Sequence, residues 1–160
     1  VGIFFFSTEV FPQLRKGEKS VYLLAGADVV PAVEGNGSMS EGGVKPFVGA
    51  GLSIKIDAVT IDGNISYIVA DGKLFAVGAG IFFETALKDG PIKRPLVFGP
   101  KYKLYVAEWE IHSLNLHVSY QVLKSILVYV ESGFATFSLR EGRETEITGQ
   151  MGVKVALNWK

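Results

Sequence analysis

The chain has 160 residues, of which 48% are hydrophobic, and its 16 lysines and arginines balance 16 aspartates and glutamates. A chain without net charge lacks the basic surface that nucleic-acid binding requires, so no nucleic-acid partner is expected. The absence of cysteine excludes disulfides, zinc–thiolate sites and thiol nucleophiles, and the absence of a run of about 18 apolar residues excludes a membrane-spanning helix.

Apolar and polar residues alternate with a period of two along most of the chain, whereas helical periodicity is hard to find. Six segments bounded by turn-forming residues show this alternation clearly, and each is predicted to be a strand. These segments are residues 20–33, 44–58, 73–87, 114–122, 126–139 and 145–160. The opening residues, 1–11, are expected to form a further strand or the end of one.

Two other segments are less regular. Residues 59–72 contain two turn signals, Asp62-Gly63-Asn64 and Asp71-Gly72, which predict a short hairpin arm. Residues 92–111 contain two prolines, which cannot donate to a ladder, so an edge strand or a bulged strand is predicted there. The alternation slips by one residue near His112-Ser113, which predicts a bulge or a short loop at that point.

About eight strands follow from this pattern, and their connections are too short for the crossovers that parallel strands need. The strand order is therefore antiparallel, and an even-numbered series that hides its own edges is most simply an up-and-down barrel. The predicted fold class is all-β, with a single barrel domain over residues 1–160.

Glycines in the predicted strands share their parity with polar residues. Gly49 and Gly51 lie on the same face as Lys55, and Gly78 lies on the same face as Glu84. On the outside of a soluble barrel such glycines would weaken the strands, whereas inside an eight-stranded barrel they make room for long side chains. We therefore interpret the polar face as the lumen and the apolar face as the side toward lipid, which makes the barrel a transmembrane one.

Charged side chains of both signs would then meet in a polar, closed lumen and pair across it. The predicted lumen network consists of Asp28, Lys45, Lys55, Asp57, Glu84, Glu131 and Lys154. Aromatic residues that face outward near strand ends would form interfacial girdles, and the candidates are Tyr102, Tyr120 and Trp159. A soluble barrel that binds an apolar small molecule in its interior would show the same alternation and is the alternative.

A third possibility is a lipid-modifying barrel enzyme. His117 and Ser119 share one strand face, and with a carboxylate such as Glu110 they have the residue types of a nucleophilic triad. The pair resembles the His-x-Ser pair of outer-membrane lipid A deacylases. Because the parity of this strand places both side chains in the lumen, away from lipid, no catalytic activity is expected. Two histidines without clustered carboxylates make a poor metal site, and no cofactor is expected.

The run GGVKPFVGAGLSIKI, at residues 42–56, resembles the strands of small eight-stranded outer-membrane barrels of the OmpX, NspA and opacity-protein type. The run MGVKVALNW, at residues 151–159, resembles their closing strand, and the likeness covers residues 20–159 as a pattern. The connections here are shorter than the long extracellular loops of that family. The resemblance implies a location in the outer membrane of a Gram-negative-type envelope, and a structural or partner-contact role. It also implies contact with membrane lipid or lipopolysaccharide, and with an envelope protein.

Overall fold

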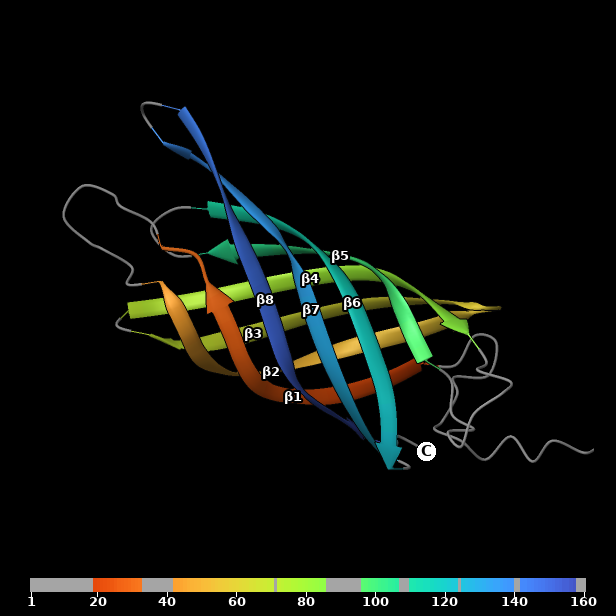
Figure 1. Ribbon diagram of the computed structural model, residues 1–160. Coiled ribbons are helices and arrows are strands. Elements are labelled where there is room, and N and C mark those ends of the chain that lie inside the picture. The colour runs from red at the N-terminus through yellow and green to blue at the C-terminus, as the bar shows by residue number, and fades with distance from the viewer. Residues whose placement is uncertain are drawn as a thin grey trace, which may run out of the picture.

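The structure, a computed structural model, describes residues 19–32, 42–70, 72–85, 96–106, 110–123, 125–139 and 142–157. These residues form β1 (Lys19–Val30), β2 (Gly43–Ile56), β3 (Val59–Ala70), β4 (Gly72–Thr85), β5 (Leu96–Val106), β6 (Glu110–Leu123), β7 (Ile126–Leu139) and β8 (Gly142–Leu157). Each strand pairs with its neighbours in chain order, and β8 pairs with β1, so the antiparallel sheet closes into a barrel (Figure 1). The prediction of an all-β barrel of eight antiparallel strands is confirmed.

The strands are staggered as they pass around the barrel. Following the paired residues once around from Lys19 on β1 leads back to β1 at Val29, which is ten residues further along the same strand. A stagger of this kind tilts the strands by about 35–45° from the barrel axis. Eight strands enclose an interior that is only wide enough for side chains to fill, so every inward residue has to fit against its neighbours.

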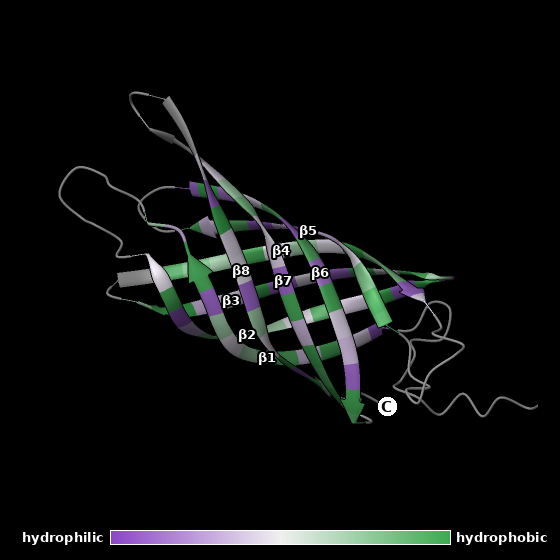
Figure 2. Ribbon diagram, in the orientation of Figure 1, coloured by the Kyte–Doolittle hydropathy of each residue, from purple (hydrophilic) through white to green (hydrophobic). Residues whose placement is uncertain are grey.

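Side chains alternate between the interior and the exterior along the strands, and Figure 2 shows this as alternating purple and green bands. On β6, for example, Asn115 and His117 are buried, whereas their neighbours Leu114 and Leu116 are exposed. Large exposed apolar side chains come from all eight strands. Polar and charged side chains make up much of the buried set, which reverses the usual arrangement of a water-soluble protein.

The segment predicted to be a hairpin arm is one continuous strand, β3, so that prediction is wrong. Asp62 and Asn64 are buried in the middle of this strand, and Gly63 between them faces outward. The reverse turn lies earlier, at Asp57-Ala58, where Asp57 has a positive φ of 55°. The Asp-Gly-Asn triplet misled the prediction because polar residues, which usually mark turns, here line the interior of a barrel.

The predictions for the segment before His112 also need correction. β5 is not an edge strand, because it pairs with β4 on one side and with β6 on the other. Pro100 lies within β5 and is exposed, and the β4–β5 register is the same on either side of it. The ladder between β5 and β6 is continuous through His112 and Ser113, whereas the irregularity lies between Gln121 and Leu123 on β6.

The two ends of the barrel differ. We call the end with Lys19 and Leu157 the terminal end and the opposite end, where β1 finishes and β2 begins, the distal end. Buried apolar side chains close the interior in its distal part, and they are Val30, Ile68, Leu74, Tyr105, Ile111 and Ala135. β7 and β8 continue past the other strands at the distal end (Figure 1). Among the described residues, apolar side chains therefore pack the distal part of the interior.

Gly26 marks a close approach between β1 and β8. A Cβ at this position would collide with the Met151 carbonyl oxygen and would lie 2.6 Å from the Gly152 Cα. We expect Gly26→Ala to lower the free energy of unfolding by about 1–3 kcal/mol, because these backbone atoms cannot move without opening the β1–β8 seam. The midpoint of denaturant unfolding, followed by far-UV circular dichroism, measures the effect.

Gly63→Ala is the matched control, because Gly63 faces outward and the nearest atom to its Cβ would be 4.0 Å away. We expect this variant to unfold at nearly the midpoint of the native protein. An equal loss of stability in the two variants would contradict the steric explanation.

Candidate functional site

The interior of the barrel holds buried charges of balanced sign. Among the side chains that the structure describes, three carboxylates and three lysines are buried, namely Asp28, Asp62, Glu131, Lys101, Lys103 and Lys154. An isolated charge in such an environment would lose several kcal/mol of hydration, so each needs a partner of opposite charge and further hydrogen bonds. The equal numbers of the two signs allow every buried charge to be compensated.

Glu131 on β7 is the centre of the first group, and its partners come from β5 and β6. Lys101 donates to Glu131 Oε1 at 2.6 Å, and His117 Nδ1 lies 2.9 Å from the same oxygen. Lys103 lies with its Nζ 3.5 Å from Glu131 Oε2 and 3.0 Å from Asp28 Oδ2. Lysines and carboxylates therefore alternate across the interior from β7 through β5 to β1.

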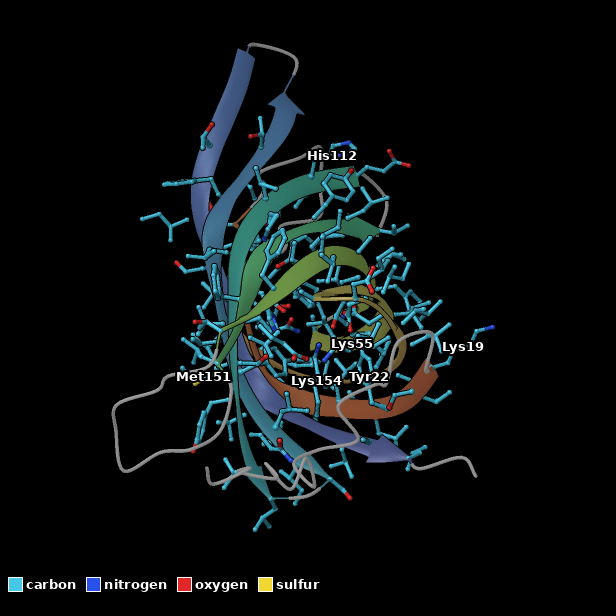
Figure 3. All side chains as sticks on the ribbon, turned by 90° about the vertical axis from the view of Figure 1, so that its right-hand side faces the viewer. Lys19, Tyr22, Lys55, His112, Met151 and Lys154 are labelled. Carbon is cyan, nitrogen blue, oxygen red and sulfur yellow. The ribbon has the colours of Figure 1, made fainter. Side chains whose placement is uncertain are left out.

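Asp62 on β3 is the centre of the second group. Its Oδ2 accepts hydrogen bonds from the Tyr22 hydroxyl and from Ser53 Oγ, both at 2.7 Å, and from Lys154 Nζ at 3.4 Å. These donors come from β1, β2 and β8, so one carboxylate ties together strands on either side of the β1–β8 seam. Figure 3 shows Lys154 and Tyr22 pointing into the interior.

Aromatic rings connect the two groups. The Lys154 ammonium lies 4.7 Å from the centre of the Tyr22 ring, 5.4 Å from that of Tyr129 and 5.5 Å from that of Phe82. His117 stacks between Phe82, at 4.3 Å, and Tyr129, at 5.4 Å. A lysine among three ring faces gains cation–π attraction in place of the hydration that it has lost.

Three members of the predicted lumen network, Asp28, Glu131 and Lys154, are buried in these two groups. Lys55 and Glu84 form a separate pair at 2.7 Å near the terminal end, where their side chains are 12% and 22% exposed. The five residues come from five strands, and the alternation of parity along each strand is enough to place them.

Lys45 is half-buried near the distal end of β2. Asp57 does not belong to the interior, because it is an exposed residue of the β2–β3 turn. The alternation places it in the lumen only if β2 is continued one residue beyond its end, at Ile56.

Sequence reasoning missed three of the buried charges. Asp62 was assigned to a turn, and Lys101 and Lys103 lie in the segment that its prolines made look irregular. The two lysines could have been found from the alternation along β5. Lys101 and Lys103 have the same parity as Tyr105, which faces inward, whereas Tyr102 has the opposite parity and faces outward.

The residues considered for catalysis are not brought together. His117 and Ser119 are both buried in the interior, and the carboxylate beside His117 is Glu131 of the neighbouring strand. Glu110 is the exposed first residue of β6, seven residues before His117, which is about 23 Å along a strand. These three residues therefore do not form a triad.

The outward aromatic candidates lie at different heights on the wall. Tyr102 is exposed in the middle of β5, and its hydroxyl contacts His112 Nδ1 on β6. Tyr120 faces outward near the terminal end of β6 and is half-buried. Trp159 lies outside the residues that the structure describes.

Within the described ranges, no group of three or more histidine, aspartate or glutamate side chains is arranged to hold a metal ion. The same residues include no helix with the length and apolar character needed to cross a bilayer. In comparisons of the sequence, no protein-family model and no curated protein matches this chain.

The interior, with its charges paired and its distal part packed, has the character of a structural core.

Substitution of Glu131 tests whether the buried ion pairs stabilise the barrel. We expect Glu131→Gln to lower the free energy of unfolding by about 3–5 kcal/mol, because Lys101 would be left as a buried charge without its carboxylate. The double variant Glu131→Gln/Lys101→Met should recover part of the loss, since the buried charges balance again. Denaturant unfolding of the two variants and the native protein gives the three values.

The ion pair of Lys55 and Glu84 near the terminal end supplies the control. Glu84→Gln removes a carboxylate from a similar ion pair with Lys55, but this pair is partly exposed. We expect a loss below about 1 kcal/mol for it. A loss as large as that of Glu131→Gln would show that burial of the charge is not the cause.

Proposed function

We propose that the protein is a small integral barrel of the outer membrane of a Gram-negative-type envelope, with a wall that faces lipid and a closed interior. Its role is structural, or to contact a partner within the envelope, and it has no enzymatic activity. Membrane lipid or lipopolysaccharide surrounds it in this proposal. The observation that carries the proposal is the distribution of charge on the outer wall.

Among the described side chains, exposed charges lie only at the two ends of the barrel. Among the side chains described, the exposed charged ones are Lys19, Asp57 and Glu110, and each is the first residue of a strand or lies in a turn. Between these ends, large apolar side chains from every strand cover the wall. Soluble monomers rarely expose apolar patches beyond a few hundred Å², so a wall of this kind favours a lipid environment.

The dimensions support the same proposal. The strands contain 11 to 16 residues, and a tilted strand needs about 9–11 to cross a bilayer. Two outward aromatic pairs flank the wall: Phe83 lies against Phe98 toward the terminal end, and Tyr67 lies against Phe75 toward the distal end. Phe75 and Phe83 are eight residues apart on β4, which is about 26 Å along the strand and about 20 Å along the axis of a tilted barrel. This separation is slightly shorter than the apolar band of about 25 Å that aromatic girdles flank in transmembrane barrels.

The two alternatives fit the geometry less well. A soluble barrel that binds an apolar molecule needs an apolar interior, whereas the middle of this interior is filled by paired charges. A lipid-modifying enzyme needs its nucleophile at the surface that faces the acyl chains. His117 and Ser119 are instead buried on the inner side of β6. Both observations support a barrel whose contacts with other molecules lie on its outer wall and its ends.

Fractionation with and without detergent tests the proposal. We expect the purified protein to need detergent to stay monodisperse, and to migrate on an SDS gel differently before and after boiling, because a closed barrel resists the detergent until it is heated. A protein that is monodisperse in plain buffer would overturn the membrane assignment and favour the soluble barrel.

A sharper test compares how much a charged substitution destabilises the barrel in the middle of the wall and at its end. Ile65 is exposed in the middle of β3, and Ile56 is exposed at the terminal end of β2. In lipid bilayers we expect Ile65→Arg to destabilise the barrel by about 2–4 kcal/mol and Ile56→Arg by about 0–1 kcal/mol, because a charge costs most at the bilayer midplane. Unfolding by guanidinium in vesicles measures both values. In a water-soluble barrel the two substitutions would have similarly small effects, which would contradict the proposal.

A further inference from the structure

One polar patch interrupts the apolar outer wall at the distal end. We call it the distal patch and define it by outward, exposed residues of four successive strands: Glu110, His112, Thr136 and Thr145 near the distal ends of β6, β7 and β8, and Tyr102, which reaches them from the middle of β5. His112 is paired with Thr136 across β6 and β7, and Thr136 is paired with Thr145 across β7 and β8. The Tyr102 hydroxyl reaches His112 Nδ1 from β5. Figure 3 shows His112 on the outside of the barrel, away from the interior that holds Lys55 and Lys154.

The patch begins where the most apolar part of the wall stops. Leu114, Phe134 and Ile147 form a row of paired residues across β6, β7 and β8, and they are 64%, 62% and 71% exposed. Two residues further along each strand, the row of His112, Thr136 and Thr145 follows. If the wall faces lipid, as proposed above, hydrocarbon ends between these two rows, and lipid headgroups lie at the level of the patch.

We propose that the distal patch binds the headgroup of a membrane lipid that carries a phosphate and, beyond the phosphate, N–H or O–H donors. The order of groups on the outer face of β6 matches such a lipid from its chains to its tip. Leu116 and Leu114 face the acyl chains, His112 faces the phosphate, and Glu110 faces the donors beyond it. Successive outward residues are about 7 Å apart along a strand, which is the scale of one headgroup.

The contact with Tyr102 suits His112 to this task. When the tyrosine hydroxyl donates to Nδ1, the proton of a neutral imidazole lies on Nε2, on the far side of the ring, where it can be donated to a phosphate oxygen. A protonated ring donates from the same atom and adds a positive charge, which strengthens the bond. The hydroxyl of Thr136, on the next strand, provides a further donor at the same height.

Glu110 sets the selectivity. A carboxylate beside the site repels a headgroup that carries only negative charge, and it accepts hydrogen bonds from one that ends in an ammonium or in hydroxyl groups. Phosphatidylethanolamine offers a phosphate and an ammonium with three N–H donors. Phosphatidylcholine has the same phosphate, but methyl groups replace those donors. The two lipids therefore separate recognition by Glu110 from recognition of the phosphate.

The experiment compares these two lipids with identical acyl chains on the purified full chain in detergent, by native mass spectrometry at equal lipid concentrations. We expect the native protein to retain phosphatidylethanolamine about fivefold more than phosphatidylcholine, as one solvent-exposed hydrogen bond of ordinary strength would give. Glu110→Gln should remove this preference while leaving the retention of phosphatidylcholine unchanged. His112→Phe should lower the retention of both lipids about fivefold, since the phosphate loses its donor.

Tyr102→Phe removes the hydroxyl that contacts His112 in the distal patch. Tyr120→Phe is its matched control, because it removes an outward hydroxyl at the terminal end. Only Tyr102→Phe should lower lipid retention. Equal retention of the two lipids by the native protein, or a preference that survives Glu110→Gln, would overturn this proposal. If the protein still needs detergent and its gel migration still changes on heating, the membrane proposal stands without this site. A protein that is monodisperse in plain buffer would overturn both.

Discussion

The narrow interior of an eight-stranded barrel is the constraint on which the rest of this structure depends. Every inward side chain competes for the same small volume, and inward glycines make room for some of the long residues. A Cβ on Gly78 would lie 2.8 Å from Lys101 Cε, and a Cβ on Gly80 would lie 2.5 Å from the nearest atom of the Phe82 ring. The glycines thus decide where Lys101 and Phe82 fit, and Lys101 in turn decides where Glu131 finds its partner.

The alternation of residues was enough to predict the barrel, its strand count and several interior charges, because period two is a direct consequence of strand geometry. The prediction was wrong where the same residue types occur both in turns and in strands that line a polar interior. Asp62 and Asn64 beside Gly63 indicate a turn in most proteins, yet in a barrel with a polar interior they occupy a strand. The pairing of Glu131 with Lys101, Lys103 and His117 depends on the stagger between strands, which no single strand's sequence contains.

The same stagger brings the interior groups together from strands that are distant in the sequence. Asp28 and Lys103 are 75 residues apart, and Lys154 and Asp62 are 92 residues apart, yet each pair meets in the interior. Contacts of such long range form only when the sheet has closed, so the charge network stabilises the closed barrel rather than any single hairpin. A buried network that is satisfied only in one register also disfavours slipped registers, in which the same charges would be left unpaired.

A packed and charge-balanced interior has a consequence for function. Among the described residues, apolar side chains fill the distal part of the interior and ion pairs fill its middle, as expected for an eight-stranded barrel, whose interior is only wide enough for side chains. Recognition by this protein then falls to its outer wall and its ends, where the chain departs from a uniform apolar surface. The distal patch is such a departure, since Tyr102, His112, Thr136 and Thr145 place hydrogen-bonding groups on a wall covered mainly by apolar side chains. If the wall faces lipid, as proposed, a polar pair on it is costly unless lipid headgroups or water satisfy it, and the proposed headgroup site would provide those partners.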